Sequence, residues 1–155
     1  MDNQTVRIDN ETYFKLVVQE LEAGNEVRIP VIGRSMEPFL RERDEVLLQT
    51  AKIADITVGD IVLARWKQRY VLHRVVRKKA DGLWLVGDNN LAQIEKIAAT
   101  DLVAVLFEAR RGGKLLPVSS TFNKNLGMLW YHLRFPRRVV VAVKRRLLKA
   151  PTDYK

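Results

Sequence analysis

The sequence predicts a mainly β domain with a coiled or barrel-like antiparallel sheet, an N-terminal helix and a basic helical tail. Short β-branched segments recur through the middle of the chain, and glycine and aspartate turn signals separate them. Helical periodicity occurs only at the two ends. We therefore expect an N-terminal helical segment over residues 1–25, a β domain over residues 26–118 and a helical tail over residues 119–155.

The first helix is expected over residues 10–23. Asn10 or Thr12 can cap its start, and Gly24 suits the position after its end. The apolar residues that share one side of this helix are Phe14, Val17, Val18 and Leu21.

Seven strands are expected in the β domain. They are EVRIPVIG at 26–33, DEVLLQTA at 44–51, GDIVLARW at 59–66, YVLHRVVRK at 70–78, GLWLVGD at 82–88, DLVAVLFEAR at 101–110 and KLLPVSS at 114–120. Pro30 restricts the first to an edge or an irregular strand. The short link before Tyr70 predicts a hairpin, and Asp81-Gly82 is a turn signal. Short strands at this spacing are typical of a barrel-like or coiled sheet.

Beyond Ser119 the pattern becomes helical. FNKNLGMLWYHLRF at 122–135 and RRVVVAVKRRLLK at 137–149 both read as helices, separated by Pro136. The net charge of +9 is concentrated here, and two interpretations are open. The tail is either a basic amphipathic helix at an anionic membrane surface or a helix packed on the domain with a solvated basic face. Nucleic acid is not expected as a partner.

Several classes of protein are excluded by composition. The chain has no cysteine, which rules out disulfides, thiolate zinc sites and a cysteine nucleophile. The two histidines are too scattered for a metal site, and no phosphate-binding glycine motif occurs, so we expect neither metal nor cofactor. The N-terminus does not resemble a signal peptide, and no apolar run is long enough for a transmembrane helix. We expect a cytoplasmic protein, with peripheral membrane contact under the first interpretation of the tail.

Ser35 and His73 are the residues with the clearest chemical potential. Ser35 lies in PVIGRSMEPFL, where a preceding glycine and a following proline predict a tight turn that exposes the hydroxyl. His73 lies in the strand YVLHRVV, and an imidazole is suited to general-base work near neutral pH. Either residue alone is more often structural, and a serine needs a base to become a nucleophile.

Their order along the chain changes this interpretation. SMEPFL, VGDIVLAR, YVLHRVV and LVGDNN follow one another over residues 35–90. This order resembles the catalytic core of the signal peptidase I-like serine peptidases, a superfamily that also contains self-cleaving repressors. The resemblance covers roughly residues 28–108 and implies Ser35 as nucleophile. Leu72-His73-Arg74-Val75 matches the branch that uses histidine as base, and the chain shows no N-terminal membrane anchor of the signal peptidase kind.

The resemblance leaves the third catalytic residue open. Asp88 in the G-D-N-N loop is the first choice to orient His73, Glu95 and Asp101 are weaker choices, and a Ser–His dyad alone is the remaining alternative. Asp60 is expected to stabilise the G-D turn. Gly33 stands where family members often carry a serine that donates to the oxyanion, so backbone N–H groups would have to serve.

Met36 and Pro38 either shape the turn and the wall of a substrate cleft or pack in the core. These assignments predict a serine endopeptidase that hydrolyses peptides or precursor proteins with small residues before the scissile bond. One alternative is a self-cleaving regulator, since Ala23-Gly24 resembles the repressor cleavage site. The other is a catalytically weak module that binds peptide, membrane or nucleic acid.

Overall fold

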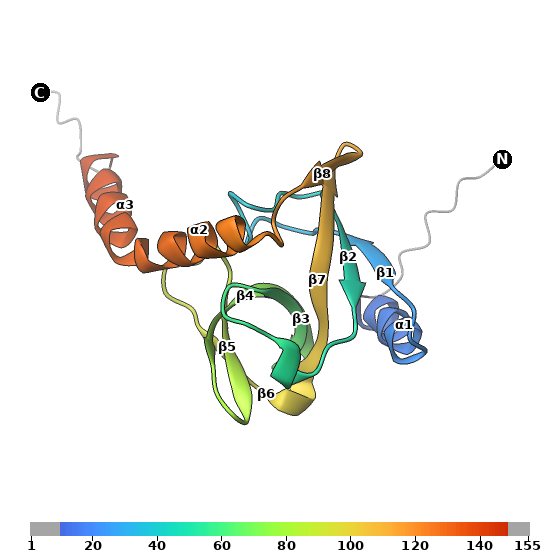
Figure 1. Cartoon of the computed structure of the whole chain (residues 1–155). Helices are drawn as coiled ribbons and strands as arrows, with labels where there is room; N and C mark the ends of the chain where they lie inside the picture. The colour runs from blue at the N-terminus through green and yellow to red at the C-terminus, as the bar shows by residue number, and fades with distance from the viewer. Residues whose placement is uncertain (1–9, 149–155) are drawn as a thin grey trace, which may run out of the picture.

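The computed structural model describes residues 10–148. One antiparallel sheet lies between an N-terminal helix and two C-terminal helices (Figure 1). The helices are α1 (Asn10–Glu22), α2 (Thr121–His132) and α3 (Arg134–Leu148). The strands are β1 (Val27–Pro30), β2 (Glu45–Gln49), β3 (Ile61–Trp66), β4 (Arg69–Lys78), β5 (Gly82–Val86), β6 (Glu95–Ala98), β7 (Leu102–Arg111) and β8 (Lys114–Leu116). The predicted fold class is confirmed.

The sheet curls on itself. Its strand order is β1-β2-β7-β3-β4-β5-β6, with β8 paired to β7, and every pair is antiparallel. The register shifts at Leu47/Leu48, at Leu63/Ala64 and between Val75 and Arg77. Such irregularities increase local twist, and Figure 1 shows β3 to β6 wrapped into a half-barrel.

Two apolar clusters fill the domain. One lies inside the curl of β3 to β6 and includes Val62, Val75 and Leu85. The other lies between α1, β1, β2 and β7 and includes Leu21, Met36 and Leu48. The Ser35 turn is therefore held by the second cluster, because the residue beside Ser35 belongs to it.

The hairpin between β3 and β4 has the turn that a tight two-residue link requires. Lys67 and Gln68 both adopt positive φ, 47° and 62°, as in the turns that match strand twist. The register then places Val62 opposite His73. The predicted hairpin is confirmed, and it fixes the position of His73 relative to β3.

Two features differ from the sequence-based expectation. Strand β6 had no counterpart among the seven expected strands, because it is short and its charged residues Glu95 and Lys96 obscure the apolar alternation. Pro136 does not separate the two terminal helices. It lies in the first turn of α3, where its missing N–H has no intrahelical partner to lose, and the break falls at Leu133.

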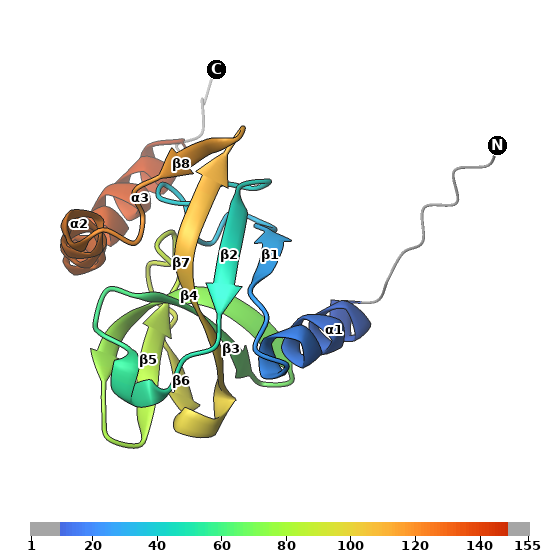
Figure 2. The ribbon, with the colours of Figure 1, turned by 45° about the vertical axis from the view of Figure 1, so that its right-hand side comes forward.

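The N-terminal helix and the two C-terminal helices lie on different sides of the sheet. Helix α1 packs near β1, whereas α2 and α3 lie at the opposite side (Figure 2). Ser120 caps α2 by accepting a hydrogen bond from the N–H of Asn123. Within residues 10–148, none of the helices combines the length and the apolarity that a membrane crossing requires. The division of the chain at residues 25 and 118 stays a prediction.

Candidate active site

The turn that carries Ser35 is anchored on both sides. Met36 and Leu40 are buried in the core, and the N–H groups of Phe39 and Leu40 donate to the Met36 carbonyl. Gly33, with φ of +78°, turns the chain out of β1 just before the serine. The hydroxyl of Ser35 is thus presented at the end of a strand by a rigid turn.

His73 meets this hydroxyl from β4. Its Nε2 atom lies 3.2 Å from Ser35 Oγ, which is hydrogen-bond distance for a nucleophile and its general base. The imidazole is buried, so bulk water has little access to the shared proton. The structure therefore brings together the two residues that were paired on sequence order alone.

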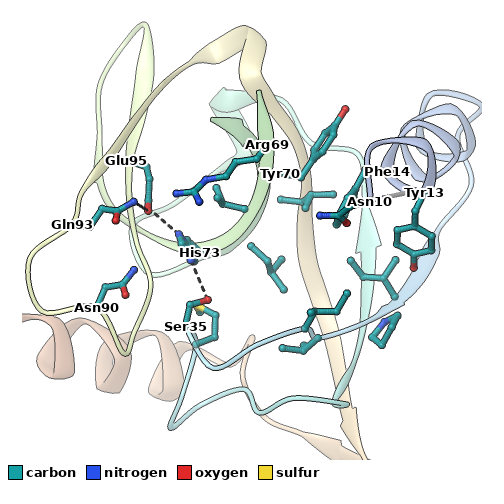
Figure 3. A pocket seen from close by; sticks show the side chains of 18 residues that line it. Asn10, Tyr13, Phe14, Ser35, Arg69, Tyr70, His73, Asn90, Gln93 and Glu95 are labelled. Carbon is teal, nitrogen blue, oxygen red and sulfur yellow. Dashed lines mark hydrogen bonds and ion pairs between the residues drawn. The ribbon is translucent and has the colours of Figure 1, made fainter. Parts of the chain in front are cut away.

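Glu95 lies on the other side of the imidazole. Its Oε2 atom is 2.9 Å from His73 Nδ1, and its Oε1 accepts a hydrogen bond of 3.0 Å from the Gln93 amide. Figure 3 shows the line that runs from Ser35 through His73 to Glu95. The carboxylate is fully buried, and its position is that of the third member of a Ser-His-carboxylate arrangement.

Strand register explains why Glu95 reaches His73. Val75 pairs with Leu85 across β4 and β5, and Leu85 pairs with Glu95 across β5 and β6. Directly paired residues share a face of the sheet, and residues two apart on a strand share it too. His73 and Glu95 therefore project from the same face, on strands that have β5 between them.

Asp88, the first choice for the orienting carboxylate, does not contact His73. Its two carboxylate oxygens accept hydrogen bonds of 2.7 and 2.8 Å from Arg74, and both side chains are buried. Arg74 is the next residue after His73, so it projects from the opposite face of β4. Because of this alternation, Asp88 lies on the face of β4 away from the His73 side chain, and Glu95 contacts the histidine instead. Burial raises the pKa of the Asp88 carboxyl, and the hydrogen bonds and charge of Arg74 offset this only in part.

The other two acidic residues that were considered act in turns. Asp101 accepts a hydrogen bond of 3.2 Å from the Ala98 N–H and does not line the site. Asp60 accepts from the N–H and the hydroxyl of Thr57 and forms an ion pair of 2.5 Å with Lys124. The expectation that Asp60 stabilises the G-D turn is confirmed.

The G-D-N-N loop packs tightly against the dyad. A Cβ atom at Gly87 would lie 2.7 Å from the Ser35 carbonyl oxygen and 3.1 Å from His73 Nε2. The N–H of Asn89 donates to the Ser35 carbonyl at 2.9 Å, and its side-chain amide donates to the Arg34 carbonyl. The loop therefore fixes the serine turn, and Gly87 is required because no side chain fits there.

The C-terminal helices support this loop from outside. The indole N–H of Trp130 donates to the Asp88 carbonyl at 2.9 Å. Arg137 donates to the same carbonyl at 3.4 Å, and its guanidinium stacks 4.1 Å from the centre of the Trp130 ring. Arg74 itself packs against Gly127 of α2, where a Cβ atom would collide with the guanidinium.

A pocket of about 350 Å³ opens at the dyad. Ser35, Met36, His73 and Glu95 line one part of it, and α1 supplies the far wall, where Phe14 stacks on Tyr70 at 4.8 Å between ring centres (Figure 3). Met36 lines this pocket and is also buried in the core, so it combines the two alternatives expected for it. Pro38 does not line this pocket and instead borders an apolar groove beside α2.

A family model that matches most of the chain identifies the family. A family model described as Peptidase S24-like matches residues 3–107. The chain belongs to the Peptidase S24-like family. No protein of curated function matches this member in sequence.

Membership of the Peptidase S24-like family supports a peptidase or a self-cleaving repressor type of fold. Ser35, His73 and Glu95 all lie inside the matched residues, whereas α2 and α3 follow them. Among residues 10–148 the structure gathers no cluster of three or more acidic or histidine side chains that could hold a metal ion.

Proposed function

We propose that this Peptidase S24-like protein is a serine endopeptidase in which Ser35, His73 and Glu95 act together. The observation that carries the proposal is the continuous contact from Ser35 Oγ to His73 Nε2 and from His73 Nδ1 to Glu95, at 3.2 and 2.9 Å, in the wall of a pocket. Serine, imidazole and buried carboxylate in this order are the parts that nucleophilic acyl transfer needs.

In the proposed reaction, the Ser35 hydroxyl attacks the carbonyl carbon of a peptide bond while His73 Nε2 accepts its proton. The imidazolium donates that proton to the leaving amine, the C–N bond breaks, and an ester on Ser35 remains. Water then attacks the ester with His73 again as base, which releases the acid and restores the serine. Glu95 holds the Nδ1 proton and offsets the charge of the imidazolium.

The oxyanion requires donors on the side of Ser35 away from the imidazole. The proposal assigns backbone N–H groups of the Ser35 turn to this role, since Gly33 offers no hydroxyl. A single donor of this kind contributes about 3 to 4 kcal/mol to lowering the barrier. Rigid anchoring of the turn by Met36 and Leu40 supports the assignment, because preorganised donors cost no reorientation during the reaction.

The proposed substrate is an extended peptide or an unfolded part of a precursor protein. The pocket is lined along one side by Ile29, Pro30 and Val31 at the end of β1, which is an edge strand of the sheet. Such an edge can pair with an extended chain. The apolar residues along this edge and the limited volume of the pocket favour small apolar side chains near the scissile bond.

Self-cleavage at Ala23-Gly24 has less support than cleavage of another chain. The N–H groups of Ala23 and Gly24 bond to carbonyls at the end of α1, at 3.0 Å each, and Gly24 has φ of +86°. Neither residue lines the pocket at Ser35. The bond is thus fixed in a helix terminus, while attack by Ser35 requires an extended chain in the pocket.

The test is cleavage of a peptide library by the purified protein, read by mass spectrometry of the new termini. We expect the wild-type protein to cut a subset of peptides and the variants Ser35→Ala and His73→Ala to cut none. Cleavage by both variants at the wild-type rate would refute the proposed site. An intact-mass measurement after long incubation at alkaline pH distinguishes self-cleavage, which would release a fragment ending at Ala23.

A further inference from the structure

Helix α3 is attached to the domain by its basic side. Arg137 donates to the carbonyls of Asp88 and Trp130, and Arg138 donates to the Leu91 carbonyl. Arg134 stacks on Tyr131 at 4.4 Å. Surface helices of globular domains normally turn their apolar face inward, and no residue of α3 is buried. The helix therefore contacts the domain mainly through its arginines, beside a groove that Val140 and Val141 line together with Leu91 and Leu133.

The apolar side of α3 is correspondingly exposed. The exposed fractions are 70% for Phe135, 50% for Val139, 65% for Val140, 49% for Val143 and 73% for Leu147. At about 100° per residue, these positions fall on one face of the helix. An exposed apolar stripe of this length does not stabilise the helix in water. We therefore expect another surface to cover it.

Basic residues border this apolar face, and acidic ones are absent from the helix. At helical spacing, Lys144 falls beside one edge of this face, Arg146 falls just inside the other edge near Phe135, and Arg145 falls on the opposite side; all three are exposed. Neither α2 nor α3 contains an aspartate or a glutamate. The surface of α3 that faces away from the domain is thus apolar at its centre and positive at its margins.

We propose that α3 binds an anionic membrane surface, with Phe135, Val139 and Val143 in the acyl boundary and Lys144 and Arg146 on the lipid headgroups. An anionic bilayer is the one occupant that satisfies both features. A second copy of this helix would cover the apolar face but would bring like charges together. A nucleic acid would neutralise the charges but would leave the apolar face in water.

The mode of attachment suits this role. A helix that docked on the domain through its apolar face would have to detach before it could meet lipid. Because α3 docks through Arg137 and Arg138, it meets a bilayer without losing its contacts with Asp88 and Leu91. The proposal does not depend on the peptidase proposal, since it concerns a surface outside the pocket.

The test is co-sedimentation with vesicles of phosphatidylcholine alone and of equimolar phosphatidylcholine and phosphatidylserine. Every protein carries Ser35→Ala, so that peptide cleavage does not affect the result. We expect binding to the phosphatidylserine vesicles that weakens with added salt. Binding to phosphatidylcholine alone should be at least about tenfold weaker, since each basic residue contributes about fivefold at an anionic surface.

Two variants separate the two contributions. Lys144→Gln, Arg145→Gln and Arg146→Gln together should weaken binding by about twenty-five-fold or more, because Lys144 and Arg146 each contribute about fivefold at the surface. Val139→Ser with Val143→Ser should weaken it by about tenfold or more, with little change in helix propensity. All of these side chains are exposed, so the fold of the β domain should not change.

Matched controls alter the same chemistry elsewhere. Leu16→Ser removes an exposed apolar side chain from α1, and Lys52→Gln, Lys79→Gln and Lys114→Gln together remove the same charge as the α3 triple variant. Both controls should bind within about threefold of the unaltered protein, apart from a weak effect of net charge.

Four outcomes would overturn the proposal. They are no binding to either vesicle, equal binding to both vesicles, equal losses in the α3 variants and their controls, and a lipid-free dimer that Val139→Ser with Val143→Ser converts to monomer while vesicle binding is absent. Peptide cleavage without vesicle binding would leave the proposed peptidase standing and refute only the membrane surface.

Discussion

Replacing Glu95 with glutamine tests the proposed role of the buried carboxylate. The substitution keeps the volume of the side chain and removes one charge at a position where the Glu95 Oε2 to His73 Nδ1 distance is 2.9 Å. The new amide has one oxygen and one NH₂ group, whereas the carboxylate accepts from both His73 and Gln93. If the NH₂ group faces His73, it selects the tautomer with the proton on Nε2, which cannot accept a proton from Ser35.

The size of the effect follows from the lost charge. The centres of a carboxylate and an imidazolium in this contact are about 4 Å apart, and at an effective dielectric constant of about 20 their attraction is about 4 kcal/mol. Loss of that stabilisation in the transition state slows the reaction by about a thousandfold. Selection of the wrong His73 tautomer would slow the reaction further. If the Gln93 amide rotates so that its oxygen accepts from the new NH₂ group, the glutamine oxygen can face His73 and this additional loss disappears.

The assay is the steady-state cleavage of a peptide that the library screen identifies. We expect Glu95→Gln to lower kcat by about a thousandfold with KM within about threefold, because this fully buried carboxylate acts through His73. Asp101→Asn is the matched control, since it replaces another carboxylate with an amide in a turn outside the pocket. A kcat within about tenfold of wild type in a folded Glu95→Gln protein, or an equal loss in Asp101→Asn, would refute the reasoning.

Three further predictions concern the surroundings of the site. Gly87→Ala should abolish cleavage while circular dichroism stays native, because its Cβ would displace the Ser35 turn or the imidazole; a fully active variant would show that the loop yields without cost. Trp130→Phe should lower the free energy of unfolding by about 1 to 2 kcal/mol in chemical denaturation, through loss of the indole hydrogen bond to the Asp88 carbonyl. The pKa of Asp44 is lowered, since hydrogen bonds from Arg111 and from a backbone N–H outweigh its burial. The stability from Asp44 is therefore present above its unfolded pKa of about 4 and is lost as pH falls through the lower folded value. Thermal melts should show a shallower loss of stability below about pH 4 for Asp44→Asn than for wild type, and parallel curves would contradict this.

The sequence predicted the parts of the site that depend on local pattern. Ser35 follows from a turn signal between Gly33 and Pro38, and His73 follows from a strand with recognisable alternation. Their proximity could be inferred because the ordered segments resemble a known family. The distance between the Ser35 hydroxyl and the His73 ring could not be predicted, since it depends on how the sheet curls.

Glu95 could not be chosen from the sequence because its role depends on strand register. Asp88 is nearer to His73 along the chain and lies in a loop that matches the family, yet it falls on the Arg74 face of β4. Glu95 reaches the histidine only because β6 pairs with β5 in one register. Glu95 and Ile97 are both buried and alternate with exposed residues. This period-two alternation was the feature of the sequence that could have placed Glu95 in a strand.

The orientation of α3 was open for a similar reason. Its amphipathic pattern is plain in the sequence. One interpretation placed the basic helix at an anionic membrane surface, and the other packed it on the domain with a solvated basic face. The attachment of α3 through its arginines depends on Arg137 and Arg138 finding carbonyl partners in the loop of residues 87–91. Those partners are contributed by a segment some 50 residues earlier, as the separations of 49 and 47 residues show.

The support of the G-D-N-N loop by Trp130 and Arg137 sets an order of events during synthesis. A ribosome completes Ser35, His73 and Glu95 before it adds α2, so a nascent chain contains the reactive residues before the contacts that brace Asp88. The braced form of the site therefore belongs only to a chain that has been made at least as far as Arg137.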